Sequence, residues 1–485
     1  MADDKEDRVV SDEQIAQPLD QRAMKPLLRK IDLNLLPIMC ATYMFQFLDK
    51  SALSNAAILG IRPDLALSGG DYSWAAAIYY FGFLVASYPA AWIMVRMPVA
   101  KFMAVSVFLW GSVLMIMALP HNAAGLLTVR FFLGVCEAPL GPGLTIIVAM
   151  WYRRSEQPLR HAAWFAGNSV AGIFGGIVAY GIGHIHSVAP WKALFLIFGA
   201  ATVLFAAVVL AMLPDIPAKA RCLSKAERDM AVARVSENMT GIRNNEYQWY
   251  QVREALLDVK TWLLAIVQFC ACVANGASNF SSIVIKGFGF TELNTLLLYS
   301  GEYLSQLCFI ILVTWISTRI HNIRTYCLAA CVLLGMLGGL LIRQLPPHLK
   351  WGRYTGVLIR ASFAAYFPLV MAMLSGNTAG FTKKTTTNAM IFMAFCAGNI
   401  VGPQLYFGSE APSYPSGFLS LIICLGVAFV ASLLLRFYLV RENRRRDAEQ
   451  LSAPGDAVAV NSLDDEVLNA MDLTDKEMPQ FRYVY

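Results

Sequence analysis

Charged residues are scarce in this sequence of 485 residues: only 15% are Asp, Glu, Lys or Arg, whereas 57% are hydrophobic. A soluble protein of this length would carry about a quarter charged residues, and the deficit here extends along most of the chain. A soluble globular domain is therefore excluded. The segments of about ten residues with alternating polarity that build a membrane β-barrel are also lacking. We expect an all-α polytopic membrane protein.

Signals for enzymatic chemistry are lacking as well. The ten cysteines and six histidines show no spacing typical of metal ligands, and the sequence contains no phosphate-binding loop and no nucleophile elbow. We therefore expect no enzyme activity, no metal and no cofactor. The first thirty residues are polar and charged, unlike the apolar core of a cleavable signal peptide.

Long apolar stretches make up most of the remaining sequence. A bilayer core about 30 Å thick needs about 20 apolar residues in each helix that crosses it. Twelve stretches meet this length, at about residues 33–61, 73–95, 102–120, 123–150, 163–185, 193–213, 262–285, 295–317, 325–343, 354–375, 386–407 and 417–439. They predict twelve transmembrane helices.

A charged segment, residues 214–261, separates the first six spans from the last six. It contains Ser224-Lys225-Ala226-Glu227, which predicts a capped helix start, and no apolar run. The polar tail beyond Arg446 is predicted to be disordered. The sequence therefore predicts five regions: a cytoplasmic arm (1–32), a six-helix bundle (33–213), a cytoplasmic central loop (214–261), a second six-helix bundle (262–440) and a cytoplasmic tail (441–485).

Lysine and arginine are distributed unevenly between alternate loops. With the N-terminus placed in the cytoplasm, the inner loops hold most of them, including Arg96, Lys101, Arg153, Arg154, Arg160, Arg319, Arg324, Lys383 and Lys384. Cytoplasmic loops of membrane proteins carry such an excess, so both termini are predicted to be cytoplasmic. The net charge of +6 is accounted for by these loops, and no nucleic-acid partner is expected.

Four charges interrupt apolar spans: Asp49 and Lys50 in the first span, and Arg130 and Glu137 in the fourth. A charge at the bilayer centre costs at least ~2.5–3.5 kcal/mol, so such residues are functional candidates. Arg130 and Glu137 are seven residues apart and lie near one helix face, about 10 Å apart along the axis. Asp49 falls between them in depth. An anion needs a fixed cation, and proton coupling needs a carboxylate that can take up a proton; this set contains both.

Other polar side chains lie within the spans and are candidates for lining a substrate cavity: Tyr79, Asn168, Arg360, Asn388 and Asn399. Ordinary hydrogen bonding between helices is the alternative for the uncharged ones. Span eight also contains a charged residue, Glu302, which could pair with Arg360. These two residues either pair with each other or lie near the outer surface.

Several motifs are spread over the chain, at residues 45–56 in span one, 79–82 in span two, 130–138 in span four and 398–404 in span eleven. Together they resemble the major facilitator superfamily and, within it, the anion:cation symporter branch and the fungal allantoate-permease group. The resemblance covers about residues 30–442. It implies a monomeric secondary transporter in the plasma membrane, whose partners are a small organic anion, protons and the bilayer.

The resemblance also implies roles for individual residues. Asp49 and Glu137 would couple transport to protons, and Arg130 would bind the anion, together with Lys50. Span five lacks the Gly-Pro signature of drug:proton antiporters, which favours symport. Relatives in this branch carry nicotinate, pantothenate, biotin and allantoate, and the sequence does not select among such carboxylates. An exporter, an internal-membrane carrier of an organic acid and a non-transporting nutrient sensor are alternatives.

A mechanism follows as a hypothesis. Protonation of Asp49 and Glu137 on the outside frees Lys50 and Arg130 to hold a carboxylate. Proton loss on the inside restores the acid–base pairs and expels the substrate. In the structural alternative, the same four charges form permanent ion pairs that lock the bundle.

Overall fold

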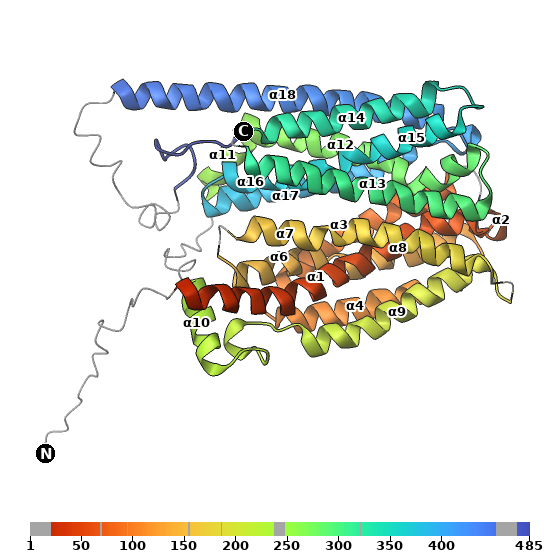
Figure 1. Cartoon of the computed structure of the whole chain (residues 1–485), viewed down its shortest axis with the longest axis horizontal. Coiled ribbons are helices and arrows are strands. Elements are labelled where there is room, and N and C mark those ends of the chain that lie inside the picture. Colours follow the sequence, from red (N-terminus) through yellow and green to blue (C-terminus); the bar gives the residue numbers. More distant parts are fainter. Residues whose placement is uncertain are drawn as a thin grey trace, which may run out of the picture.

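The computed structural model describes residues 21–67, 70–94, 96–153, 156–185, 187–236, 248–320, 322–452 and 473–485. Within these ranges the regular secondary structure is helical, and no strand is present. A helix satisfies its own backbone hydrogen bonds, as a segment surrounded by lipid must. Figure 1 shows two stacked groups of roughly parallel helices, one from each half of the chain.

The first group, here called the N-bundle, precedes the central loop. Two of its spans are built from paired helices with a short break between them. Its members are α1 (Gln21–Ile58), α3 (Asp71–Met94), α4 (Val99–Ile116), α5 (Ala123–Glu137) with α6 (Leu140–Trp151), α7 (Gln157–Phe165) with α8 (Gly167–Ile182), and α9 (Pro190–Met212), while the short α2 (Ile61–Asp64) follows α1.

The second group, the C-bundle, follows the central loop. Its fourth span is broken by a 3₁₀ turn, η3 (Ala361–Ala365), between α15 and α16. Its members are α12 (Val259–Gly287), α13 (Glu292–Arg319), α14 (Arg324–Gln344), α15 (Lys350–Arg360) with α16 (Tyr366–Asn377), α17 (Phe381–Gln404) and α18 (Pro415–Ser452), with the 3₁₀ turn η4 (Gly408–Glu410) between the last two.

The predicted spans all coincide with helices. In the described part of the chain, 11 helical segments are long and apolar enough to cross a membrane. The remaining predicted span is α17, which has 24 residues but starts with Lys383, Lys384 and several threonines. It packs between α12 of its own bundle and α3 of the other bundle. A place between other helices explains why α17 is less apolar than the rest.

The central loop contains η2 (Pro217–Lys219), α10 (Lys225–Ser236) and α11 (Trp249–Leu257). The predicted helix start is confirmed. The amide of Ser224 donates to Glu227 and the amide of Glu227 donates to the Ser224 hydroxyl, at 2.7 and 3.3 Å. These reciprocal bonds form a capping box. Lys30 of α1 also pairs with Glu227, so α10 is tied to the N-bundle.

The two bundles meet through α8 and α13, α3 and α17, and α1 and α12. Small residues allow the closest approach. A Cβ at Gly176 would collide with Ser300 of α13, and one at Gly172 would collide with the ring of Tyr303. Close contact between helices at small residues is the usual packing mode in membranes.

The first turns of α1 and the tail residues 473–485 lie on one side of the bundles, at the left in Figure 1, together with α10 and α11. We call this side the basic end, since it carries the loops rich in lysine and arginine. The prediction of a disordered tail is wrong for residues 473–485, which fold back onto the C-bundle at the basic end. This segment is ordered because Asp475 forms buried ion pairs with Lys260 and Lys383. The predicted N-terminal arm lies largely outside the described residues.

Candidate transport site

The geometry of the site starts with the crossing of α3 and α5. A Cβ at Gly134 would collide with the carbonyl of Tyr79, and one at Gly82 would collide with the carbonyl of Phe131. The backbones therefore touch at this crossing. The contact places the side chain of Tyr79 against the charged face of α5, and it gives Gly134 a purely steric reason to be glycine.

Glu137 and Arg130 both lie on this face and are buried. The hydroxyl of Tyr79 donates to Oε2 of Glu137 at 2.6 Å, while Oε1 has no hydrogen-bond partner among the residues that the structure describes. Arg130 donates from Nε to the carbonyl of Ala75 at 3.0 Å. Its guanidinium lies 5.6 Å from the centroid of the Tyr79 ring, and its Nη1 lacks a described partner.

Lys50 extends from α1 towards the same region. Its Nζ lies 5.1 Å from the ring centroid of Tyr80 and 5.6 Å from that of Phe47. Its charge interacts electrostatically with those of Glu137 and Arg130, and its side chain is half-buried. Lys50, Arg130 and Glu137 thus form one cluster on the N-bundle, which we call the charged cluster.

No member of the charged cluster forms an ion pair within 4.0 Å with any residue in the described ranges. The expected direct acid–base pairing is therefore not present in this structure. The alternative in which permanent ion pairs lock the bundle is contradicted for the same reason. Both cations are left with hydrogen-bonding capacity, because aromatic rings and one backbone carbonyl are their principal contacts.

Asp49 occupies a different environment from its neighbour Lys50. Its Oδ2 accepts hydrogen bonds from the indole of Trp110 in α4 and from the hydroxyl of Thr202 in α9, both at 3.0 Å. The side chain is completely buried and faces the interior of the N-bundle rather than the contact between bundles. Its charge still interacts with that of Glu137, so the two acids lie near each other.

The C-bundle presents neutral polar groups to Lys50. Cys272 of α12 lies within electrostatic range of Lys50. The Cys272 sulfur lies 3.2 Å from the hydroxyl of Tyr366 and 3.3 Å from Nε2 of Gln268. Asn399 accepts from Asn275 at 3.1 Å. Polar groups of both bundles therefore meet beside the charged cluster.

The remaining candidates lie apart from one another. Asn168 accepts a long hydrogen bond, 3.5 Å, from Gln306 across the contact between α8 and α13. Asn388 is exposed on α17, on the same face as Phe392, whose ring lies 5.7 Å from that of Phe83 in α3. Asn388 therefore lies on the side of α17 that faces α3 of the N-bundle.

Arg360 is the candidate with the clearest structural role. It forms a buried ion pair with Glu302, which also accepts from Ser281. Of the two arrangements left open by the sequence, pairing with Glu302 is the one observed. The pair lies within the C-bundle and ties together α12, α13 and α15.

The comparisons with known proteins agree with this architecture. The family model described as the Major Facilitator Superfamily matches residues 39–403, which is most of the chain. The chain belongs to the Major Facilitator Superfamily.

Similar proteins of this superfamily include fungal transporters. An uncharacterized transporter of Schizosaccharomyces pombe is 37% identical over 94% of this chain and 87% of its own length. The allantoate permease of Saccharomyces cerevisiae is 33% identical over 94% of this chain and 85% of its own length. These relatives are transporters and not enzymes, and the chain is accordingly an integral membrane transporter.

Solved structures of the superfamily show the same fold. A bacterial homologue of the human lysosomal transporter Spinster, in an inward-facing conformation, has a TM-score of 0.61 at 15% identity. The match covers 83% of this chain and 95% of that one. The transporter FucP, in an outward conformation, has a TM-score of 0.54 at 17% identity, over 82% of this chain and 98% of that one.

Sequence reasoning missed the polar groups on the C-bundle side of this facilitator fold. Gln268, Cys272 and Asn275 recur at spacings of four and three residues along an otherwise apolar span. This spacing places them on one helix face, which is the signal that would have found them. Tyr366 and the two partners of Asp49 carried no comparable signal, because single polar residues in a span do not reveal which way they face.

Proposed function

We propose that this facilitator carries a small organic anion across the membrane by symport with protons. One observation supports the proposal most directly. The charges of Lys50 and Arg130 interact with each other, and neither has an acidic ion-pair partner within 4.0 Å in the described ranges. A carboxylate entering the site would supply that partner. An unpaired cation buried in protein costs several kcal/mol, so binding a carboxylate relieves an existing cost.

Arg130 is the stronger of the two anchors. Its planar guanidinium can hold a carboxylate through two parallel hydrogen bonds, whereas the ammonium of Lys50 acts as a point charge. One edge of the guanidinium is already positioned by the bond to Ala75, and Nη1 is unpartnered. In our proposal, Lys50 adds charge and Tyr79 orients the site.

Proton coupling is assigned mainly to Glu137. Its carboxylate accepts from Tyr79, interacts with the side chain of Gln46, and lies within electrostatic reach of both cations. A proton on this group removes a negative charge from the cluster, so the two cations attract an anion more strongly. Proton loss reverses the effect and favours release. Asp49 lies in the interior of the N-bundle and influences the charged cluster through its charge interaction with Glu137.

Uptake by whole cells tests the proposal. Glu137→Gln and the wild type are expressed in yeast deleted for its own carboxylate transporters, and labelled allantoate, nicotinate and pantothenate are offered at two external pH values. We expect the wild type to accumulate one of these anions uphill in acid medium. The variant is expected to exchange that anion by counterflow but not to accumulate it. Uphill accumulation by Glu137→Gln contradicts the coupling role.

A second comparison separates anion binding from coupling. Arg130→Lys keeps the charge but removes the bidentate geometry, so we expect its KM to rise while some uphill accumulation remains. Arg445→Lys is the matched control, since this arginine of α18 is largely exposed and lies away from the site, and it is expected to leave uptake unchanged. If none of the three anions and no other carboxylate is carried by the wild type, the substrate class is wrong, whatever the variants do.

A further inference from the structure

The tail segment, residues 473–485, docks onto the basic end of the C-bundle. Asp475 is completely buried, and its two oxygens accept from Lys260 at the start of α12 and from Lys383 at the start of α17, at 2.5 and 2.6 Å. The hydroxyl of Tyr483 donates to the same carboxylate at 2.7 Å. One acidic side chain of the tail therefore joins two transmembrane helices.

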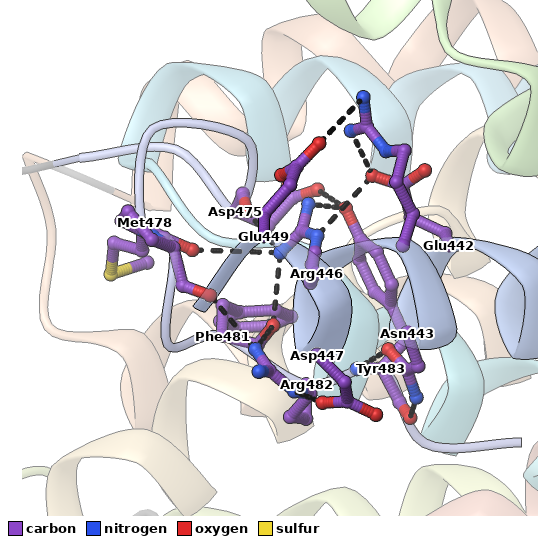
Figure 2. Close-up of polar contacts among 12 residues, drawn as sticks. Glu442, Asn443, Arg446, Asp447, Glu449, Asp475, Met478, Phe481, Arg482 and Tyr483 are labelled. Atoms are coloured by element: carbon purple, nitrogen blue, oxygen red, sulfur yellow. Dashed lines mark hydrogen bonds and ion pairs between the residues drawn. The ribbon is translucent and has the colours of Figure 1, made fainter. Parts of the chain in front are cut away.

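Arg446 in α18 fixes the backbone of the tail segment, as Figure 2 shows. Its Nη1 donates to the carbonyls of Asp475 and Phe481, both at 2.9 Å, and its Nη2 donates to the Tyr483 hydroxyl at 2.8 Å. Asn443 exchanges two hydrogen bonds with the backbone of Tyr483, at 2.8 and 2.9 Å. The segment thus fits a specific site on the C-bundle.

The tail segment also holds the end of α16. Asn377, the last residue of α16, exchanges two hydrogen bonds with the backbone of Val484, at 2.8 and 2.7 Å. In the turn that follows, Gly380 has a φ of +86° and no room for a side chain, since a Cβ would lie 2.9 Å from Gln251 and 3.2 Å from Thr474. The turn between α16 and α17 is therefore packed directly onto the tail.

Holding the end of α16 in place restrains the movement of this helix relative to α15. The 3₁₀ turn η3 separates α16 from α15, and a 3₁₀ stretch within a helix often marks a hinge. Beyond this break, Tyr366 contacts Cys272 and Gln268 beside the charged cluster. The ring of Phe367 stacks on Phe165 of the N-bundle at 4.7 Å. Movement of α16 would change both contacts.

The site is also able to release the tail. Without Asp475, Lys260 keeps Asp258 at 2.6 Å and Lys383 keeps Glu254 at 2.7 Å. Undocking therefore leaves neither lysine without an acidic partner, which is the arrangement expected of a reversible contact.

We propose that the tail segment is a reversible latch that restrains α16, the basic-end half of the broken span, and so controls opening of the transporter at that end. The docked latch keeps α16 against α7. Release allows α16 to swing about η3 and separates Phe367 from Phe165.

Cytoplasmic pH does not operate this latch. Burial raises the pKa of Asp475, but Lys260 and Lys383 outweigh burial and lower it to about 2. A depressed pKa in the folded state means that the contribution of Asp475 is complete above its unfolded value, about 3.9, and is lost only as pH falls towards about 2. The charged and titratable groups that face it, Lys260, Lys383, Asp258 and Tyr483, leave it ionised at neutral pH.

Amide hydrogen exchange of the purified full-length protein tests the proposal. In Asp475→Asn we expect exchange to accelerate in residues 473–485 and in α16 by at least about tenfold, because a buried charged hydrogen-bond partner is lost. Exchange in α15, on the other side of η3, is expected to stay unchanged. Lys476→Ala is the matched control, since this neighbouring side chain is exposed.

Asn377→Ala provides an independent variant, because it removes only the contact between α16 and Val484. We expect it to accelerate exchange in α16 while the ion-pair cluster around Asp475 stays protected. The proposal is overturned if either variant frees the tail without accelerating exchange in α16. It is equally overturned if all helices of the C-bundle exchange faster together, since the tail would then be a general clamp for folding.

Discussion

Removing Glu302 is expected to destabilise the C-bundle strongly. Arg360 is 1% exposed, and Glu302 is its one acidic partner within 4.0 Å in the described ranges. The variant Glu302→Gln leaves this guanidinium buried without a counter-charge. Breaking a buried ion pair from one side costs about 3–5 kcal/mol.

This cost converts to a shift in melting temperature. Unfolding entropy is about 2.1 cal/mol/K per residue, so 485 residues give about 1 kcal/mol/K. A loss of about 3–5 kcal/mol therefore lowers Tm by about 3–5 °C. Differential scanning fluorimetry of the purified protein in detergent measures this shift.

Glu292→Gln is the matched control on the same helix. Glu292 pairs with Lys286 at 2.7 Å, but both side chains are largely exposed, and an exposed pair contributes about 0–1 kcal/mol. We also expect Arg360→Met added to Glu302→Gln to recover most of the lost stability, because removing both partners leaves no buried charge. A shift for Glu302→Gln no larger than the control's would refute the reasoning. Arg360 would then be hydrated, and its candidacy as a substrate ligand would gain support.

Two further predictions concern the N-bundle. Gly134→Ala places a Cβ against the carbonyl of Tyr79 and is expected to lower stability by at least about 1–3 kcal/mol, whereas Gly141→Ala, which meets no atom within 4 Å, is expected to be neutral or stabilising in the same melting assay. Trp110→Phe keeps an aromatic but smaller side chain and removes the donor to Asp49, so we expect a loss of at least about 1–3 kcal/mol. That loss should shrink in an Asp49→Asn background, and strictly additive losses in the double variant would contradict the proposed hydrogen bond.

The sequence predicted the transmembrane layout well because the bilayer imposes a simple rule on composition and length. Every span that hydropathy suggested coincides with a helix, including α17, which falls short of the apolarity of the others. The charges inside spans were equally visible, since any charge in an apolar run stands out. In the structure, Asp49, Arg130 and Glu137 are buried and Lys50 is half-buried.

The direction in which each side chain points could not be predicted from the sequence. Asp49 and Lys50 are neighbours, so a helix turns their side chains about 100° apart, and either could have faced the gap between bundles. The choice depends on Trp110 and Thr202, which lie 61 and 153 residues away. The tail posed the same difficulty. In the sequence, nothing distinguishes Asp475 from the other acidic residues of the polar tail. Its partner Lys260 is 215 residues away, and only the fold brings the two together.

Buried basic side chains differ in whether they have an acidic partner, and the difference bears on function. In the C-bundle, Arg360, Lys260 and Lys383 each have an acidic partner, so their burial is compensated and needs no ligand to explain it. In the N-bundle, Arg160 likewise pairs with Asp32 at 2.8 Å, but Lys50 and Arg130 have no acidic partner within 4.0 Å in the described ranges. Charges kept buried without compensation reduce stability, and a protein retains them where they perform work. This contrast favours the N-bundle cluster as the site of anion binding, and it leaves Arg360 with a structural explanation that is already sufficient.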